Sequence, residues 1–201
     1  MAPLKVTYFD ARGRAELIRM CLYFGGIEFE DNRLSHAEFA EKKAKGAFPF
    51  CQLPTIEGGD LPCVFCQSIA CARYAAKLAG LYPEDPVEAL KCDSVIDGCI
   101  DILQKVIPAH FEKDEEIKKA LLEKLYSATI PAWCACLEKF IVGKYILGDK
   151  LCFADIALAN SIESLGEDIF VAFPQLKEYM ERVHSIPRIA EWIEKRPVTA
   201  Y

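Results

Sequence analysis

Tyr8 and the basic residues that follow it form the first group of side chains that could carry chemistry. Tyr8 lies near the end of an apolar run and precedes Asp10-Ala11-Arg12-Gly13-Arg14. A phenol at a strand-to-helix turn can donate a hydrogen bond to an anion such as a thiolate, while a neighbouring guanidinium stabilises the charge. The alternative, commoner for so short a segment, is that Tyr8 is a half-buried strand aromatic.

Gln67 and Ser68 form a second polar group, at the start of an apolar helical pattern. A helix start offers free backbone N–H groups and the positive end of the dipole, which suits a carboxylate ligand. An ordinary helix cap is the alternative. Upstream, Leu53-Pro54 precedes another short strand, and a cis bond there would leave the backbone groups of Leu53 free to pair with an extended peptide ligand.

The N-terminal part of the chain alternates strand and helix patterns. Apolar residues at helical spacing follow Tyr8 and end at Gly25-Gly26, and a second helix follows Gln67-Ser68. Gly58-Gly59-Asp60 has the composition of a hairpin turn. The expected strands are Leu4 to Phe9, Phe29 to Leu34, Thr55 to Glu57 and Leu61 to Phe65, with a variable segment between the second and third.

Two prolines in Leu81-Tyr-Pro-Glu-Asp-Pro86 interrupt both kinds of periodicity and predict a linker. Beyond it we find only helical patterns. The expected helices start near Glu88, Glu115, Pro131, Ala154, Pro174 and Pro187. The sequence therefore predicts an α/β N-terminal domain followed by an all-α C-terminal domain.

Composition limits the partners of this chain. Its 201 residues are 52% apolar, enough to bury a large core. A formal charge of -6 and a pI near 5.2 argue against non-specific binding to nucleic acid or to an anionic membrane. The N-terminus lacks the apolar run of a signal peptide, and no apolar stretch is long enough to span a bilayer. We expect a cytoplasmic protein that binds small molecules or protein.

The chain has ten cysteines. Cys63-Val-Phe-Cys66 has the spacing of a redox dithiol, but within a strand the two side chains would face opposite sides. Cys134-Ala-Cys136 lacks zinc-ligand spacing and paired histidines, so we expect no metal site. Six cysteines lie in apolar helical patterns, where a reduced thiol behaves as a small hydrophobe: Cys21, Cys71, Cys92, Cys99, Cys134 and Cys136.

Three stretches together carry a family resemblance: Tyr8-Phe9-Asp10-x-Arg-Gly-Arg14-Ala-Glu, Pro49-Phe-Cys-Gln-Leu-Pro54, and Gln67-Ser68-Ile-Ala-x-Ala-Arg73-Tyr74. In order and spacing they resemble the signature stretches of the cytosolic glutathione S-transferases. The linker, the helical second half and the ending Trp192-Ile-x-x-Arg196-Pro197 extend the resemblance over the whole chain. Tyr8-Phe9, with Asp31 and Arg33, is most similar to the sigma class, which includes glutathione-dependent prostaglandin D synthases and lens S-crystallins.

The resemblance implies a thioredoxin-like glutathione-binding domain over residues 1–79, a linker over 80–86, and an all-helical domain over 87–201 that contributes an apolar second-substrate site. Glutathione would be the co-substrate. Tyr8 would donate its hydroxyl to the glutathione sulfur, with Arg14 adding positive potential. Gln67 and Ser68 would take the γ-glutamyl carboxylate. The other implied glutathione-binding residues are Leu53 at the cysteinyl unit, Phe39, Lys43 and Gln52 at the glycyl end, and Asp97.

Asp97 belongs to an acidic stripe, Asp93, Asp97 and Asp101, at fourfold helical spacing. Carboxylates stacked in this way repel one another unless a cation or a partner approaches. Solvated surface is the plain interpretation. The resemblance instead implies a homodimer in which Asp97 reaches the glutathione amino group of the neighbouring subunit.

Three positions depart from the family pattern. Phe39 stands where the family has Trp, so one donor to the glycyl carboxylate is missing and we expect weaker glutathione binding. Cys51 replaces a Gly, which puts a thiol beside the tripeptide site. Cys152 replaces the Ser or Thr that caps a helix, although Asp155 keeps the acid of the capping box, and we expect a loss of about 1 kcal/mol.

Three functions remain open. The pattern of Tyr8 and Arg14 implies conjugation of glutathione to small apolar electrophiles, as in detoxification. A prostaglandin-D-synthase-type isomerase would use the same thiolate, although Ala109 stands where the vertebrate synthases carry Trp. A ligand carrier or crystallin-like protein would need no catalysis, but such crystallins are rich in methionine and this chain has only 3. The sequence does not name the second substrate.

Overall fold

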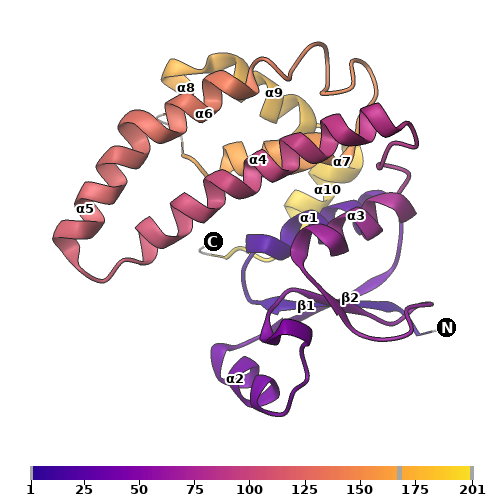
Figure 1. Cartoon of the computed structure of the whole chain (residues 1–201). Helices are drawn as coiled ribbons and strands as arrows, with labels where there is room; N and C mark the ends of the chain where they lie inside the picture. Colours follow the sequence, from indigo (N-terminus) through magenta and orange to yellow (C-terminus); the bar gives the residue numbers. More distant parts are fainter. Residues whose placement is uncertain (1, 167–168, 200–201) are drawn as a thin grey trace. The chain divides into compact units, whose positions relative to one another are not determined.

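The structure is a computed structural model that describes residues 2–166 and 169–199. The chain divides into two compact units, Met1–Tyr82 with Ile186–Tyr201, and Pro83–Ser185. The first contains a small sheet with helices and the second is helical (Figure 1). The α/β and all-α parts expected from the sequence are therefore both present.

The sheet of the first unit has four strands in the order β2-β1-β3-β4. β1 (Leu4–Phe9) runs parallel to β2 (Phe29–Leu34) and antiparallel to β3 (Thr55–Glu57), which pairs antiparallel with β4 (Phe65–Cys66). The central strands supply fully buried residues such as Val6 and Ile56. Three of the four strands have the predicted bounds.

The fourth strand starts later in the chain than the predicted Leu61. β4 contains only Phe65–Cys66, because its partners in β3 are Ile56 and Thr55. The Gly58-Gly59-Asp60 turn therefore opens a longer loop, rather than a tight hairpin. Within it, Gly58 has φ +84, and a Cβ at this position would lie 2.3 Å from the carbonyl oxygen of Pro3. Cys63 belongs to this loop and not to a strand.

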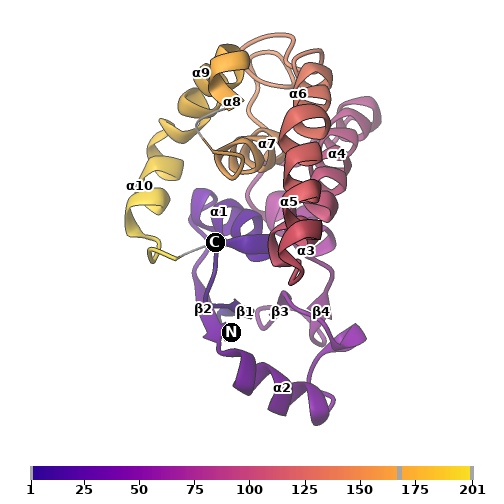
Figure 2. The same ribbon diagram turned by 90° about the vertical axis from the view of Figure 1, so that its left-hand side faces the viewer.

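Helices lie on both sides of the sheet (Figure 2). α1 (Glu16–Phe24) and α3 (Ser68–Leu78) pack against each other on one side, where the small side chains Ala72, Ala75 and Ala76 are buried. α2 (His36–Ala44) lies on the other side, in the segment to which the sequence analysis assigned no element. Its start is a capping box in which Ser35 and Glu38 satisfy each other's backbone amides.

The last helix of the chain belongs to the first unit. α10 (Pro187–Lys195) packs on α1, and the indole of Trp192 donates to the buried carboxylate of Glu16 over 2.8 Å. The expected helical domain over 87–201 therefore differs from the compact unit, which ends at Ser185. The sequence pattern predicted a helix starting near Pro187 but gave no information on which helix it contacts.

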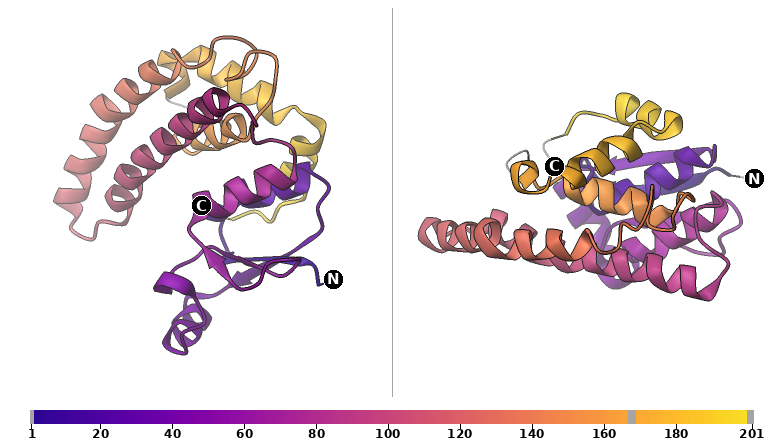
Figure 3. Two further views of the ribbon diagram at one scale, coloured as in Figure 1. Left: turned by 45° about the vertical axis from the view of Figure 1, so that its right-hand side comes forward. Right: turned by 90° about the horizontal axis from the view of Figure 1, so that it is seen from above.

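The second unit is built around α7 (Phe153–Glu163), which is buried along nearly its whole length. The long helix α4 (Pro86–Phe111) contacts α7, α5 (Glu115–Lys124) and α6 (Ile130–Leu137), and it runs alongside the α5–α6 arm (Figure 3). α4 starts at the last residue of the predicted linker, because Asp85 caps it by accepting from the Val87 and Glu88 amides. Among the described residues, the unit also contains a π-helical segment (Leu125–Thr129) between α5 and α6, α8 (Ile169–Ala172) and α9 (Pro174–His184).

All ten cysteines are free thiols. Five of the six that were assigned to apolar helix faces are buried, but Cys136 is exposed. Burial raises the pKa of the Cys71, Cys99 and Cys134 thiols to about 12, so these groups stay protonated near neutral pH. The helical cysteines are packing residues, with Cys136 as the exception.

Candidate functional site

The strand register brings three predicted groups to one end of the sheet. Thr7 pairs with Thr55, and Thr55 pairs with Cys66. At this end of the sheet, Tyr8 is the next residue of β1, Pro54 immediately precedes β3 and Gln67 immediately follows β4. These three residues form one edge of the sheet. Adjacent strands are about 4.8 Å apart, so this edge spans about 10 Å, close to the length of an extended tripeptide.

The Tyr8 hydroxyl is held by the turn that follows its strand. The main-chain N–H of Arg14 donates to the phenolic oxygen over 3.3 Å. Gly13 lets the turn come this close: it has φ +41, and a Cβ there would lie 2.8 Å from the Tyr8 oxygen and from its ring. Because the phenolic oxygen is the acceptor in this hydrogen bond, its own O–H remains available to donate to a ligand. Arg14 thus contacts Tyr8 through its backbone amide, whereas the sequence analysis considered its charge.

Arg19 is a residue of this region that the sequence analysis missed. It lies on α1 and is fully buried, and its guanidinium carbon is 6.0 Å from the centroid of the Tyr8 ring. Two carboxylates hold it, Asp31 at 2.7 Å and Glu16 at 3.3 Å. In the sequence, Arg19 follows Glu16 by three residues on a helix whose other residues are largely apolar. Such a pair is usually exposed to solvent, so the pattern did not indicate burial.

Gln52, Leu53 and Gln67 come together beside this edge. The Leu53-Pro54 peptide bond is cis. Within residues 2–166 and 169–199, neither the amide nor the carbonyl of Leu53 forms a hydrogen bond to the protein. The side chain of Gln67 donates to that of Gln52 over 3.3 Å. Backbone groups without a protein partner, next to two amide side chains, are suited to binding a peptide.

Ser68 is the first residue of α3 and is buried. Gln67, which precedes the helix, has φ 74 and does not cap it with its side chain. The first amides of α3 are therefore not satisfied by that side chain, and the positive end of the helix dipole lies at the same edge as Tyr8. This arrangement is suited to a carboxylate.

Phe39 and Lys43 lie on α2, in an aromatic cluster that leads back to Tyr8. The ring of Phe39 is 5.2 Å from that of Phe9 and 5.6 Å from that of Phe48, and Phe9 in turn contacts Tyr8 at 5.4 Å. The ammonium group of Lys43 lies 5.6 Å from the centre of the Phe39 ring. The cluster therefore connects α2 to both the Tyr8 strand and the segment before Gln52.

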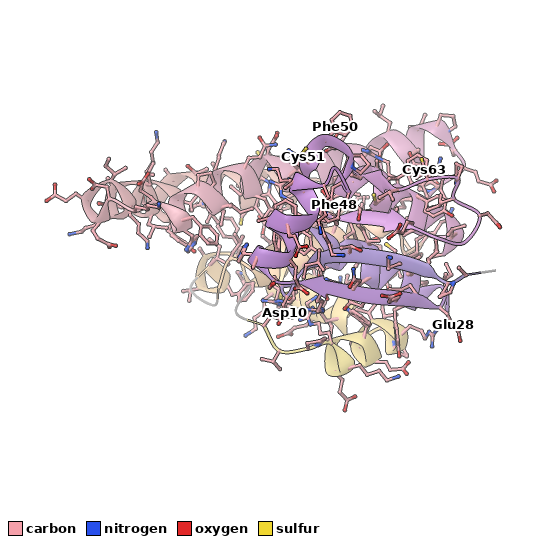
Figure 4. All side chains as sticks on the ribbon, turned by 90° about the horizontal axis from the view of Figure 1, so that it is seen from below. Asp10, Glu28, Phe48, Phe50, Cys51 and Cys63 are labelled. Carbon is pink, nitrogen blue, oxygen red and sulfur yellow. The ribbon has the colours of Figure 1, made fainter. Side chains whose placement is uncertain are left out.

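Cys51 lies in the short 3-10 segment Pro49–Cys51 that leads to Gln52. Its φ is 53, a left-handed conformation that glycine adopts more readily. The thiol is exposed, and the preceding Phe50 has 79% of its surface exposed (Figure 4). In the same view, Asp10 marks the Tyr8 end of the first unit's sheet and Glu28 the opposite end.

Asp97 lies on α4 in the second unit and is exposed. Its expected role at the glutathione amino group stays a prediction, since it concerns a neighbouring subunit. In the described parts of the chain, no group of three or more His, Cys, Asp or Glu side chains could hold a metal ion. No helix in those parts is long and apolar enough to cross a membrane.

The chain matches two family models, "Glutathione S-transferase, N-terminal domain" over residues 4–77 and "Glutathione S-transferase, C-terminal domain" over residues 100–196. It belongs to the glutathione S-transferase family, and the sheet and helices within residues 4–77 are the thioredoxin-like domain of that fold.

Individual relatives cover the full chain. It is similar to glutathione S-transferase 1 of Ascaris suum, with 34% identity over 100% of both chains, and to hematopoietic prostaglandin D synthase of Gallus gallus, with 33% identity over 100% of both. Among solved structures, rat hematopoietic prostaglandin D synthase in complex with a quinoline matches with a TM-score of 0.90 and 28% identity, covering 99% of this chain and 100% of that one. A monomeric glutathione S-transferase of the hookworm Necator americanus matches with a TM-score of 0.89 and 33% identity, again covering 99% and 100%.

Proposed function

We propose that this protein activates the thiol of glutathione and conjugates it to small apolar electrophiles. The observation that carries the proposal is the register of β1, β3 and β4, which leads Tyr8, Leu53-Pro54 and Gln67-Ser68 to one edge of the sheet. The Tyr8 hydroxyl accepts from the Arg14 amide and keeps its own proton for the glutathione sulfur. A donor to sulfur favours the thiolate, which is the nucleophilic form.

The other residues at this edge of the sheet are suited to bind the remaining parts of glutathione. The start of α3 at Ser68, with Gln67, suits the γ-glutamyl carboxylate, since a helix start offers amide donors and positive potential. The backbone of Leu53, which has no partner in the described part of the chain, suits the cysteinyl unit in an extended pairing. Lys43 and Gln52 suit the glycyl carboxylate, with Phe39 as an apolar neighbour. Arg14 adds positive charge close to the sulfur.

In the reaction with a chloronitrobenzene, the thiol proton leaves to solvent and the thiolate sulfur attacks the ring carbon that bears chlorine. A carbon–sulfur bond forms, the carbon–chlorine bond breaks, and chloride leaves with the bonding electrons. The Tyr8 hydroxyl acts only on the first stage, because its hydrogen bond lowers the pKa of the thiol and makes the thiolate available near neutral pH.

The direct test is retention on immobilised glutathione and turnover of a chloronitrobenzene, with Tyr8→Phe as the variant. We expect Tyr8→Phe to fold normally and to lose roughly 100-fold in rate at neutral pH, the typical cost of one donor to a developing or bound anion. The loss should shrink as the pH rises toward the ordinary thiol pKa of about 8.5, where the thiolate forms unaided. A wild-type rate for the variant across the pH series would reduce Tyr8 to a packing residue.

A second function is supported by the similarity to prostaglandin D synthases. The same thiolate would open an endoperoxide in an isomerisation that uses glutathione without consuming it. Ala109, buried in α4, is smaller than the Trp of the vertebrate synthases, and this favours a differently shaped pocket. Conversion of an endoperoxide at a rate comparable with conjugation would favour this function. Binding of apolar dyes with neither turnover would favour a carrier.

We further infer a sigma-class, cytoplasmic homodimer that takes part in detoxification, on the strength of the family resemblance and the acidic stripe around Asp97. The solved relative from Necator americanus is described as monomeric, so a monomer is the alternative state. Sedimentation distinguishes them: a 22.6 kDa species at micromolar concentration would exclude the dimer. Asp97→Ala should weaken glutathione binding modestly if its carboxylate reaches a neighbouring subunit, and should have no effect in a monomer.

A further inference from the structure

A few contacts hold the turn over residues 10–14, which positions the Tyr8 hydroxyl. The Ala11 amide donates to the Phe9 carbonyl at 2.7 Å, the Gly13 carbonyl accepts from the Glu16 amide, and the Asp10 carboxylate pairs with Arg33 at 3.1 Å. The contact of this turn with Tyr8 is the 3.3 Å hydrogen bond from the Arg14 amide, which is long for an N–H donor. Because a small shift of the turn would break that bond, the position of the hydroxyl depends on whatever fixes the turn.

Arg19 fixes it. Its Nη1 donates to the carbonyl of Ala11 at 2.9 Å and to the carbonyl of Arg12 at 3.2 Å. These two carbonyls immediately precede Gly13 and Arg14, which contact Tyr8. The Nε–H of Arg19 serves Asp31, and the two hydrogens of Nη1 are shared among three acceptors, the two carbonyls and Glu16. Within the described residues, the buried Nη2 has no hydrogen-bond partner.

Arg19 is itself held from two sides. Its Nε donates to Asp31 on β2 at 2.7 Å, and its Nη1 contacts Glu16 on α1 at 3.3 Å. Glu16 in turn accepts from Trp192 at 2.8 Å and from Arg196 at 3.2 Å. A fully buried cation matched by two carboxylates has little freedom to move, so the two carbonyls that it holds are also fixed.

We propose that Arg19 is a positioning residue for Tyr8, which acts by fixing the 11–14 turn and through it the hydroxyl that meets the glutathione sulfur. The catalytic part of this inference rests on the proposed function, whereas the effect on the turn does not. A purely structural role would predict lower stability without a specific change at the turn or in the pH dependence of the reaction.

The main test uses Arg19→Lys, which keeps the charge and loses the fork of donors. We expect the Arg14 amide, observed by nuclear magnetic resonance with labelled arginine, to exchange with solvent about fivefold faster, since one hydrogen bond is lost. We expect kcat to fall about 10- to 100-fold, as for a misplaced catalytic group. The inflection of kcat/KM against pH should also move toward that of Tyr8→Phe.

A double variant separates positioning from general damage. If Arg19 acts through the Tyr8 hydroxyl, Arg19→Lys should change the rate of Tyr8→Phe by less than about twofold, because the group that it positions is already absent. Equal fractional losses in both backgrounds would overturn the proposal. An unchanged Arg14 amide in Arg19→Lys would also overturn it, whatever the activity.

Two further variants keep the test decisive. Asp31→Asn weakens the ion pair that holds Arg19 but keeps Arg19 itself. This variant serves as the test if Arg19→Lys does not fold. Asp31→Asn should show smaller changes of the same kind in Arg14 amide exchange and in the pH dependence of kcat/KM. Wild-type amide exchange and a wild-type pH profile would contradict the proposal. Lys5→Met is the control, since it removes an ion pair with Glu57 at 2.6 Å on the same strand as Tyr8 but away from the turn, and it should leave both readouts unchanged.

The amide measurement also separates this inference from the proposed function. If the wild-type protein neither binds nor conjugates glutathione, the proposed function fails, while the exchange of the Arg14 amide still decides whether Arg19 fixes the turn. If the wild-type protein is active and Arg19→Lys changes neither readout, the positioning role fails alone.

Discussion

Each of the two compact units contains a buried carboxylate that holds its segments together, but the partners differ in kind. Glu16 in the first unit is surrounded by cations and an indole: Arg19, Arg196 and Trp192. Asp155 in the second unit is fully buried and accepts from neutral donors, the amides of Ile146 and Cys152 and the hydroxyl of Tyr179.

The difference separates two uses of a buried charge. Around Asp155, burial and then the carboxylate raise the pKa of the Tyr179 hydroxyl, which keeps that group a donor. This network links the start of α7, the loop before it and α9. The Glu16 network instead ends at the turn next to Tyr8. One carboxylate therefore stabilises a core, and the other also supports a functional group.

Asp155→Ala should have the largest effect on stability. It leaves three buried donors without an acceptor, and we expect the free energy of unfolding to fall by about 3–5 kcal/mol. Urea denaturation measures it, with Asp149→Ala in the nearby exposed loop as the control, expected within about 0.5 kcal/mol. A loss as small as that of the control would mean that neutral donors around a carboxylate stabilise little.

Trp192→Phe tests the corresponding bond in the first unit. It removes the indole donor to Glu16, and we expect a loss of about 2 kcal/mol because the acceptor is charged. Trp133→Phe is the matched variant: that indole donates to the neutral carbonyl of Gly98 at 2.9 Å, and its loss should cost about 1 kcal/mol. Equal losses in the two variants would remove the distinction between charged and neutral acceptors.

Phe39→Trp restores an indole donor near the glycyl end of glutathione. A gain of up to about tenfold in affinity would follow from one hydrogen bond of roughly 1.4 kcal/mol. Lys43→Ala should then be less harmful in the Phe39→Trp background, because two donors share one acceptor. Calorimetric titration of the four variants measures both effects. Equal affinities of wild type and Phe39→Trp would show that the carboxylate is already satisfied.

The smallest effect should come from a charge pair at the surface. The hydrogen bond to Glu57 raises the pKa of Lys5 above its ordinary 10.5. A raised pKa in the folded state means that this contribution is fully present below pH 10.5 and is lost as the pH rises through the folded value. Lys5→Met should change stability by less than about 1 kcal/mol at neutral pH, and by nothing at strongly alkaline pH. Denaturation at both pH values tests it.

The sequence predicted the elements of the site better than their connections. Tyr8, Leu53 and Gln67 could be chosen because strand ends, a Pro before a strand and a polar pair before a helix have local signatures. α2 also had one, the Ser35 and Glu38 capping box, which the sequence analysis did not use. Such signatures depend only on residues that are close together in the chain, so they can be recognised in the amino-acid sequence.

The burial of Arg19 and the contacts of α10 could not be predicted in this way. A charged residue on an amphipathic helix is usually exposed, and its burial here depends on Asp31, Glu16 and two carbonyls, which come together only in the folded sheet. The apolar stripe from Pro187 onward predicted a helix without indicating that Trp192 would reach Glu16, a residue 176 positions earlier. Pairings over such distances are a property of the tertiary structure.

The return of α10 to the first unit also affects how the protein is made. The N-terminal sheet leaves the ribosome first, but Glu16 meets Trp192 and Arg196 only after nearly the whole chain has been translated. The unit that carries Tyr8 is consequently completed last, although its synthesis begins first. A ribosome stalled before residue 186 would hold a nascent chain with all of its glutathione-binding candidates and without the helix that completes the unit around them.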